Sequence, residues 1–131
     1  MGVHAANLAG AMRSSADHAV VSLCRTADWF ADRPHHREIY MIDKTGNYNP
    51  SLHAAVTDAV QSIEAFLHEG RQVVVHCHGG RSRTGLVLKA WYMQRYEASH
   101  EDAHDWLDRC WPLYSQWNRE FTEFLEDEWG S

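Results

Sequence analysis

The sequence is poor in cysteine and has no long hydrophobic run, and both shortages exclude classes of protein. Its three cysteines are widely and unevenly spaced, so they do not form the framework of a small disulfide-stabilised secreted domain. No apolar run approaches the ~20 residues of a membrane-spanning helix, and no secretory signal pattern opens the sequence. We therefore expect a cytoplasmic location and no insertion into a membrane.

The composition indicates one folded domain. Hydrophobic residues make up 44% of the 131-residue chain, which argues against intrinsic disorder. This length supports a single hydrophobic core, and no internal repeat or low-complexity segment divides the sequence. We expect residues 1–131 to form one domain, either complete or trimmed at its N-terminus from a longer, multidomain protein.

Strand patterns and helix patterns alternate along the chain. Predicted strands cover residues 19–23, 38–42 and 73–75. Predicted helices cover residues 7–15, residues 49–67, a segment with its apolar pattern starting at Leu86, residues 99–110, and a C-terminal segment with the buried stripe Trp117, Phe121, Phe124 and Leu125. Asn49 is expected to cap the second helix, with Pro50 at its first position. The alternation predicts an α/β fold in which a central, mostly parallel sheet is flanked by helices.

The segment His76–Gly85, with the sequence HCHGGRSRTG, holds most of the chemically informative residues. It follows the apolar strand Val73–Val75 and precedes the helical pattern that starts at Leu86. Backbone N–H groups of such a glycine-containing loop can turn inward on a phosphate, and the N-terminus of the following helix adds partial positive charge. The same field favours the thiolate form of Cys77, which is the attacking form. The planar Arg83 guanidinium can bind two phosphate oxygens. The segment therefore predicts an anion cradle around a nucleophile, at the C-terminal end of a central strand.

Two other interpretations of this segment carry less weight. His76, Cys77 and His78 could be metal ligands, but adjacent residues on a strand point to opposite faces, and no Cys-x-x-Cys or spaced histidine pair accompanies them. Cys77 could also be an inert buried residue, because free cysteine packs as a small hydrophobe. An inert cysteine would not explain the neighbouring glycines and the two arginines. We therefore expect a site without metal or cofactor.

The pattern His-Cys-x5-Arg-Thr-Gly, with Gly80 in mid-loop and a strand-then-helix context, resembles the active-site loop of the cysteine-dependent protein tyrosine phosphatase superfamily. The short chain resembles members of the dual-specificity branch, and the amino-acid sequence of the loop resembles that of bacterial members of this branch. The resemblance extends over the order of elements from about Val20 to Leu125. It departs at the N-terminus, where members begin with one or two further strands and Gly2–Ala5 could be the remnant of one.

The resemblance implies a role for each residue of the loop, called here the phosphate loop (residues 77–83). Cys77 would attack phosphorus and form a cysteinyl-phosphate, and Thr84 would stabilise the thiolate when it returns. Arg83 would hold the phosphate oxygens together with the backbone of the residues between, which are His78, Gly79, Gly80, Arg81 and Ser82. His76 would orient the loop, although by itself it could equally be a hydrogen-bonded core residue. The implied activity is the hydrolysis of phosphate monoesters.

The departing oxygen also needs a proton, and the resemblance implies that an aspartate on a mobile loop some thirty-odd residues before the cysteine supplies it. Asp43 lies 34 residues before Cys77, and Gly46 with its polar neighbours suits a movable loop. Asp43 could instead merely end a strand or accept from a turn amide. Asp28 and Asp32 are competitors that lie farther from the expected position.

The distribution of charge bears on the binding partner. The chain has a net charge of −6, yet residues 71–96 contain basic and no acidic side chains, whereas residues 97–131 contain ten acidic residues against only Arg109 and Arg119. A locally positive segment on an acidic body suits a phosphorylated protein or small molecule better than duplex nucleic acid, which requires a broad basic face. The acidic stretch itself has the usual pattern of a solvated helix face.

The choice of substrate depends on the residues around the phosphate loop. His78 and Arg81 could recognise additional negative charge, as in a phosphoinositide, a nucleotide or an RNA 5′ phosphate, whereas a single phosphotyrosine or phosphoserine needs neither. Candidates for the rim of the site are Trp29, Phe30, His35, His36 and Tyr48, although any of them could equally be an ordinary packing residue. A different class of function is a phosphate-binding module that has lost turnover. A rhodanese-like sulfur carrier fits less well, because its cysteine loop does not call for the distal arginine and Thr-Gly.

Cys24 follows the predicted strand at residues 19–23. By the resemblance this strand lies beside the one that leads to the phosphate loop, so Cys24 would sit at the same end of the sheet as Cys77. A reactive thiolate is readily oxidised, and a nearby cysteine can trap it as a reversible disulfide. Cys24 is thus a candidate redox partner or, equally, a buried packing residue.

Overall fold

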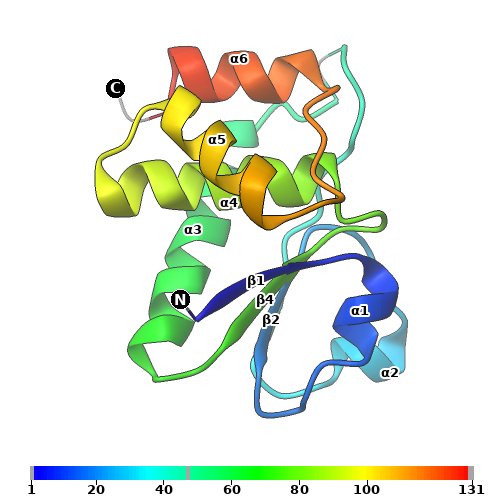
Figure 1. Ribbon diagram of the computed structural model, residues 1–131. Coiled ribbons are helices and arrows are strands. Elements are labelled where there is room, and N and C mark those ends of the chain that lie inside the picture. Colours follow the sequence, from blue (N-terminus) through cyan, green and yellow to red (C-terminus); the bar gives the residue numbers. More distant parts are fainter. Residues whose placement is uncertain (1, 47, 130–131) are drawn as a thin grey trace.

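The computed structural model describes residues 2–46 and 48–129, which are built around a four-stranded sheet (Figure 1). The strands are β1 (Val3–Ala6), β2 (Ala19–Ser22), β3 (His36–Glu38) and β4 (Val73–His76). They are hydrogen-bonded in the order β1-β4-β2-β3, and every neighbouring pair is parallel. The expected α/β fold with a parallel central sheet is therefore confirmed.

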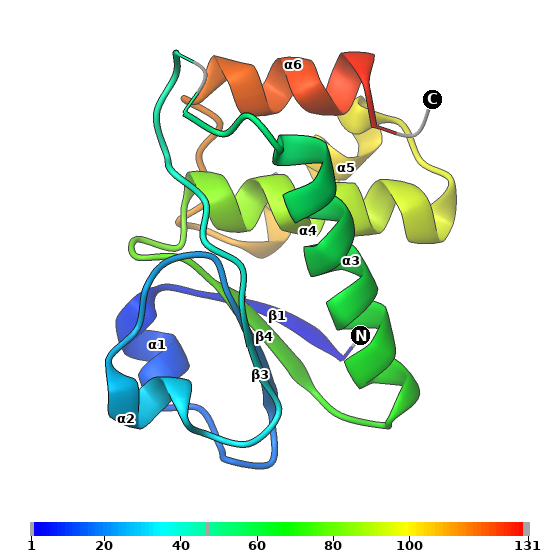
Figure 2. The same cartoon turned by 180° about the vertical axis from the view of Figure 1, so that it is seen from behind.

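Helices cover both faces of the sheet. In the described part of the chain they are α1 (Leu8–Met12), α2 (Asp28–Ala31), α3 (Leu52–His68), α4 (Ser82–Tyr96), α5 (His100–Cys110) and α6 (Arg119–Asp127). The short helices α1 and α2 lie on one side of the sheet, and α3 to α6 lie on the other (Figure 1 and Figure 2). Two separate groups of buried apolar side chains match this division, a small one that includes Phe30 of α2 and a large one that includes Trp91 of α4.

β2 and β4 occupy the centre of the sheet, and all of their residues are buried. The β-branched run in β4 suits a strand that is covered on both faces. Val74 contributes to the small core, whereas Val73 and Val75 contribute to the large core, because successive side chains of a strand point to opposite faces. Since β2 and β4 are parallel, their C-terminal ends meet at one edge, where the phosphate loop begins.

α4 runs through the middle of the large core. It starts at Ser82, before the apolar pattern that begins at Leu86, and most of its residues are buried. It contacts β4, α3, α5 and α6, which explains why it has apolar side chains on all sides. A helix held on so many sides gives the phosphate loop a rigid C-terminal anchor.

The second strand differs from the sequence prediction. Residues 38–42 were expected to form it, whereas β3 spans His36–Glu38. The amides of Ile39 and Met41 still donate to carbonyl oxygens of the β2 segment, at 2.8 and 3.1 Å. Ile39 and Met41 are buried and Tyr40 is exposed. The alternation that suggested a strand is therefore real, but regular pairing begins and ends earlier than it predicts.

Asn49 does not cap a helix, and this expectation is wrong. α3 starts only at Leu52. The Asn49 side chain instead accepts from Ile42 N at 2.9 Å and donates to Ile42 O at 2.7 Å, because a carboxamide carries a donor and an acceptor side by side. These bonds hold together the two ends of residues 42–49, called here the Asp43 loop.

The ends of the chain also differ from the sequence predictions. Val3–Ala6 forms a full strand paired with β4, where the sequence suggested a remnant. α1 ends at Met12 instead of Ser15. α6 begins at Arg119, so Trp117 precedes the helix, is 56% exposed, and does not belong to the buried stripe. Within the described ranges, no helix has the length and apolar character that crossing a membrane requires.

Candidate active site

The phosphate loop connects β4 to α4 and is held from behind by neighbouring elements. Gly80 has a φ of +70°, and a Cβ at this position would lie 2.9 Å from the carbonyl oxygen of Ala6, so the close approach to β1 requires glycine. Leu8 N donates to His78 O at 3.0 Å, and Trp111 Nε1 donates to Gly80 O at 2.6 Å. The loop is therefore fixed by α1 on one side and by the segment that follows α5 on the other.

Cys77 follows β4 directly, and only 2% of its surface is exposed. The hydroxyl of Thr84, in the first turn of α4, donates to Cys77 Sγ at 3.1 Å. Thr84 is itself fully buried, so packing keeps this donor on the sulfur. A hydroxyl donor stabilises a thiolate more than a thiol, because the acceptor is then charged.

Arg83 closes the phosphate loop. Its Nη1 donates to the carbonyl oxygen of Met41 at 3.1 Å. Its Nε is buried and has no hydrogen-bond partner among the residues that the structure describes. An unpaired buried donor is costly, and a phosphate oxygen is an acceptor that the planar guanidinium fits. Arg83 can therefore donate to an oxyanion at this loop without giving up its bond to Met41.

His76 lies beneath the loop in a chain of hydrogen bonds. Its Nδ1 is 3.1 Å from Cys77 O, and its Nε2 is 2.5 Å from Ser22 Oγ. Burial lowers the pKa of His76 to about 4, so the ring is neutral at pH 7. In the tautomer that satisfies both contacts, Nδ1–H donates to Cys77 O and the Ser22 hydroxyl donates to Nε2. Ser22 Oγ is also 2.7 Å from His36 Nε2. The first peptide of the phosphate loop is thereby tied to β2.

Asp43 is held by the cap of the last helix. Asn118 Nδ2 donates to Asp43 Oδ1 at 3.1 Å, while Asn118 Oδ1 accepts from Phe121 N at the start of α6. Asn118 is fully buried, and its Nδ2 also lies 3.4 Å from the carbonyl oxygen of Lys44, its second acceptor in the Asp43 loop. Met41, two residues before Asp43, accepts a hydrogen bond from Arg83, so the segment that leads into the Asp43 loop contacts the phosphate loop.

The two competing aspartates lie elsewhere. Asp28 is in the first turn of α2 and Asp32 is the residue that ends this helix. Both are exposed, and α2 packs on the face of the sheet opposite α4 (Figure 1). Of the three candidate acids, Asp43 is the one whose own segment contacts Arg83.

The candidate rim residues divide into two groups. Trp29 and Tyr48 are 65% and 51% exposed, and His35 is half-buried. Phe30 is buried and packs edge-on against His76, with ring centroids 6.0 Å apart, and His36 is engaged with Ser22. Phe30 is therefore a packing residue, which was the alternative to a rim position, and the half-buried His36 contacts Ser22. The short helix α2 turns Trp29 outward and Phe30 inward.

His78 and Arg81 extend outward from the phosphate loop, and both are exposed. Their side chains add a positive group and an ionisable group at the surface of the loop. Neither side chain takes part in the hydrogen bond between Thr84 and Cys77. In the described ranges, no group of three or more histidine, cysteine or acidic side chains is arranged to hold a metal ion.

Ser22 and Asn118 belong to the site but escaped the sequence analysis. Each is a polar residue with no exposed surface, and such residues are buried to make hydrogen bonds. The signal for Ser22 was a hydroxyl inside an apolar strand. The signal for Asn118 was an asparagine just before the apolar stripe of the last helix, which is typical of an N-cap.

Cys24 follows β2 and is buried. Burial raises the pKa of its thiol above the ordinary value, the charge of Arg83 opposes this shift, and Cys77 adds to it. The amide of the preceding residue, Leu23, donates to His76 O at 2.9 Å, so Cys24 lies near the start of the phosphate loop. Cys24 and Cys77 are free thiols, as is Cys110, which is exposed at the end of α5.

Comparison with known proteins agrees with this geometry. The family described as dual specificity phosphatase, catalytic domain, matches residues 11–125. A probable tyrosine-protein phosphatase of Candida albicans (strain WO-1) is 27% identical over 74 residues, which are 56% of this chain and 12% of that protein. The chain thus spans only a small part of the length of this curated relative.

Several solved phosphatase structures share the fold. The active form of Tk-PTP is 28% identical, with a TM-score of 0.68 and coverage of 85% of this chain and 79% of that one. DUSP15 is 19% identical, with a TM-score of 0.80 and coverage of 98% and 83%. Human DUSP28 is 20% identical, with a TM-score of 0.76 and coverage of 95% and 88%. The resemblance to the dual-specificity branch is confirmed, and the kinship with bacterial members stays a prediction. The chain therefore belongs to the dual specificity phosphatase family of cysteine-based phosphatases.

Proposed function

We propose that this chain hydrolyses phosphate monoesters in two steps through a cysteinyl-phosphate. The observation that carries the proposal is that one loop, after β4, holds both the buried sulfur of Cys77 and the unpaired Nε donor of Arg83. Cys77 Sγ accepts from Thr84, and Arg83 Nε is unpaired among the described residues. A nucleophile with a stabilised anionic form and a donor for an oxyanion are the two requirements of the first step.

In the first step, Cys77 Sγ attacks phosphorus. An S–P bond forms and the P–O bond to the leaving group breaks, while the Asp43 carboxyl gives its proton to the departing oxygen. Asn118 donates to Asp43 Oδ1, which favours placing the acidic proton on the other oxygen, Oδ2. Arg83 and the backbone amides of residues 78–83 hold the three equatorial oxygens and stabilise their charge.

In the second step, water attacks the phosphorus of the cysteinyl-phosphate. The Asp43 carboxylate takes a proton from this water, the S–P bond breaks, and inorganic phosphate is released. The Thr84 hydroxyl, already bonded to Cys77 Sγ, stabilises the returning thiolate. Asp43 ends the cycle protonated, ready for the next leaving group.

The substrate is a phosphorylated protein or a small phosphorylated molecule. The exposed His78 and Arg81 favour a substrate with negative charge beyond the reacting phosphate, such as a phosphoinositide, a nucleotide or an RNA 5′ phosphate. A screen of phosphopeptides against these three classes discriminates between them. In such a screen Arg81→Ala should raise KM for the preferred, highly charged substrate and leave a singly phosphorylated peptide unaffected.

The direct test of the proposed function is hydrolysis of p-nitrophenyl phosphate and its inhibition by vanadate. Turnover that vanadate suppresses supports the enzyme. Vanadate binding without turnover would instead identify a phosphate-binding module that has lost catalysis. Turnover that survives Cys77→Ser would contradict covalent catalysis.

A further inference from the structure

Lys89 is a buried cation in the middle of α4. Only 2% of its surface is exposed, and its Nζ lies 3.0 Å from His100 Nε2 and 3.2 Å from Gln116 Oε1. Its ammonium also sits 5.1 Å from the centroid of the Tyr114 ring. Burying a charge is expensive even when it is hydrogen-bonded, and an apolar side chain of similar size is often at least as stable. The placement of Lys89 therefore suggests a role other than packing.

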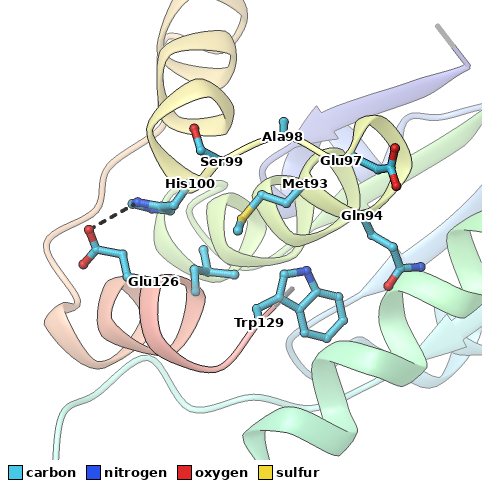
Figure 3. A pocket seen from close by; sticks show the side chains of 9 residues that line it. Met93, Gln94, Glu97, Ala98, Ser99, His100, Glu126 and Trp129 are labelled. Carbon is cyan, nitrogen blue, oxygen red and sulfur yellow. Dashed lines mark ion pairs between the residues drawn. The ribbon is translucent and has the colours of Figure 1, made fainter. Parts of the chain in front are cut away.

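The groups around Lys89 are mainly neutral acceptors. On α5, burial together with Lys89 and His104 lowers the pKa of His100 to about 4, so His100 is neutral and can accept from the ammonium. Burial lowers the pKa of Lys89 to about 8, while Glu126 of α6 opposes this shift. His100 Nδ1 is 3.7 Å from Glu126 Oε2, and Figure 3 shows this pair at a cavity of about 580 Å³ that Lys89 does not line.

The second acceptor, Gln116, belongs to the segment 111–118, which we call the α5–α6 linker. This linker touches the catalytic elements at both ends. Near its start, Trp111 donates to the phosphate loop, and a Cβ on Gly85 would lie 2.8 Å from the Tyr114 ring. At its end, Asn118 donates to Asp43. In Figure 1 the linker is the orange segment that leads from α5 to α6.

Lys89 thus donates a hydrogen bond to Gln116 of the linker. Gln116 lies two residues before Asn118, whose side chain binds the proposed general acid, Asp43. We infer that Lys89 is a positioning residue, which holds Gln116 so that Asn118 presents its amide to Asp43. This inference rests on the proposed function, because it concerns the proton that Asp43 gives to the leaving oxygen. Lys89 acts through two intermediaries and does not touch the substrate.

The inference predicts a loss confined to the protonation of the leaving group. Lys89→Met keeps the length of the side chain and removes its donors. On phenyl phosphate, whose leaving group needs a proton, we expect kcat/KM to fall roughly tenfold, a part of the ~10²–10⁴-fold that a general acid contributes. On dinitrophenyl phosphate, whose leaving group departs unprotonated, kcat/KM should stay within about twofold, because this ratio reports only the steps up to the cysteinyl-phosphate. The alkaline limb of the kcat/KM profile, which reports the acid in the free enzyme, should shift.

Two comparisons separate positioning from a general structural effect. Arg95→Met is the matched control, because Arg95 is on the same helix but pairs with Glu64 on the surface; it should leave both substrates unaffected. In the Asp43→Asn background, Lys89→Met should cause no further loss, because both changes remove the same proton transfer. A structural defect would slow the Asp43→Asn enzyme further.

Gln116→Leu is the second variant, and it covers the case in which Lys89→Met does not fold. Gln116 is exposed, and its loss should reproduce the selective effect on phenyl phosphate. Equal losses on both substrates, or no loss in either variant, would overturn the positioning role while leaving the proposed function intact. A wild-type protein that hydrolyses neither substrate would overturn the proposed function, and this inference with it.

Discussion

The Ser22 hydroxyl lies 2.5 Å from Nε2 of His76 and joins β2 to β4 directly beneath the phosphate loop. Burial of the imidazole ring disfavours its charged form, and in the neutral ring Nε2 can accept from the Ser22 hydroxyl. The folded state therefore resists protonation of His76, in agreement with its low pKa. An unfolded chain has no such restriction, and stability must depend on pH.

The first prediction is that the free energy of unfolding decreases as the pH falls from about 6.5 to about 4. The unfolded state takes up a proton on His76 near pH ~6.5, whereas the folded state does so only near pH 4. Proton uptake by the unfolded chain favours unfolding throughout this interval. Urea unfolding at several pH values measures the slope.

His76→Gln should reduce the slope of the unfolding free energy against pH. His100, whose pKa is also about 4, should account for part of the slope that remains in this variant. His68→Gln is the matched control, because His68 is an exposed residue at the end of α3. A slope that is unchanged by His76→Gln would show that His76 is not held neutral.

The second prediction concerns the nucleophile. Cys77→Ser should abolish hydrolysis and leave the fold and vanadate binding intact, because serine has nearly the same shape but is a far weaker nucleophile at neutral pH. Arg83→Lys should be nearly as damaging and should also weaken vanadate binding, since a lysine lacks the planar fork. Steady-state kinetics with calorimetry of vanadate binding measure both. A Cys77→Ser enzyme that loses less than about tenfold in kcat does not use a covalent intermediate.

The third prediction concerns the acid. Asp43→Asn should lower kcat/KM, which reports the first step, roughly 10²–10⁴-fold on phosphates with poor leaving groups and much less on activated aryl phosphates. Asn118→Ala removes the bond to Asp43 Oδ1 and should give a smaller loss with the same selectivity. If Asp43→Asn slows both kinds of substrate equally, Asp43 is structural. If it slows neither, Asp28 or Asp32 becomes the candidate acid.

The fourth prediction concerns oxidation. Peroxide should inactivate the wild type reversibly, and mass spectrometry should detect a Cys24–Cys77 crosslink, because both are free thiols near the phosphate loop. Cys24→Ser should convert this into irreversible loss, since no second thiol then traps the oxidised Cys77. Cys110→Ser is the control, as this thiol is exposed on α5. Full recovery of Cys24→Ser after treatment with a thiol reductant would remove the case for a redox partner.

The alternation of strand and helix patterns along the chain predicted the parallel sheet, and the resemblance of residues 76–85 to a phosphatase loop implied that Thr84 acts on Cys77. β4, the phosphate loop and the first turn of α4 are continuous, so the residues that form the cradle are neighbours in sequence. The bond from Asn118 to Asp43 joins residues 75 positions apart, and no local pattern specifies it. Asn49 misled the prediction for a related reason, since its side chain found a partner in Ile42 instead of in the helix that follows.

The bond from Trp111 to Gly80 has a consequence for the order in which the protein acquires its function during synthesis. The strand and loop that carry Cys77 leave the ribosome well before Trp111 and Asn118, because translation proceeds from the N-terminus. A nascent chain ending near α4 would contain the nucleophile and Arg83 but neither the brace on Gly80 nor the side chain that holds Asp43. Phosphate hydrolysis should therefore begin only after the α5–α6 linker has emerged and docked.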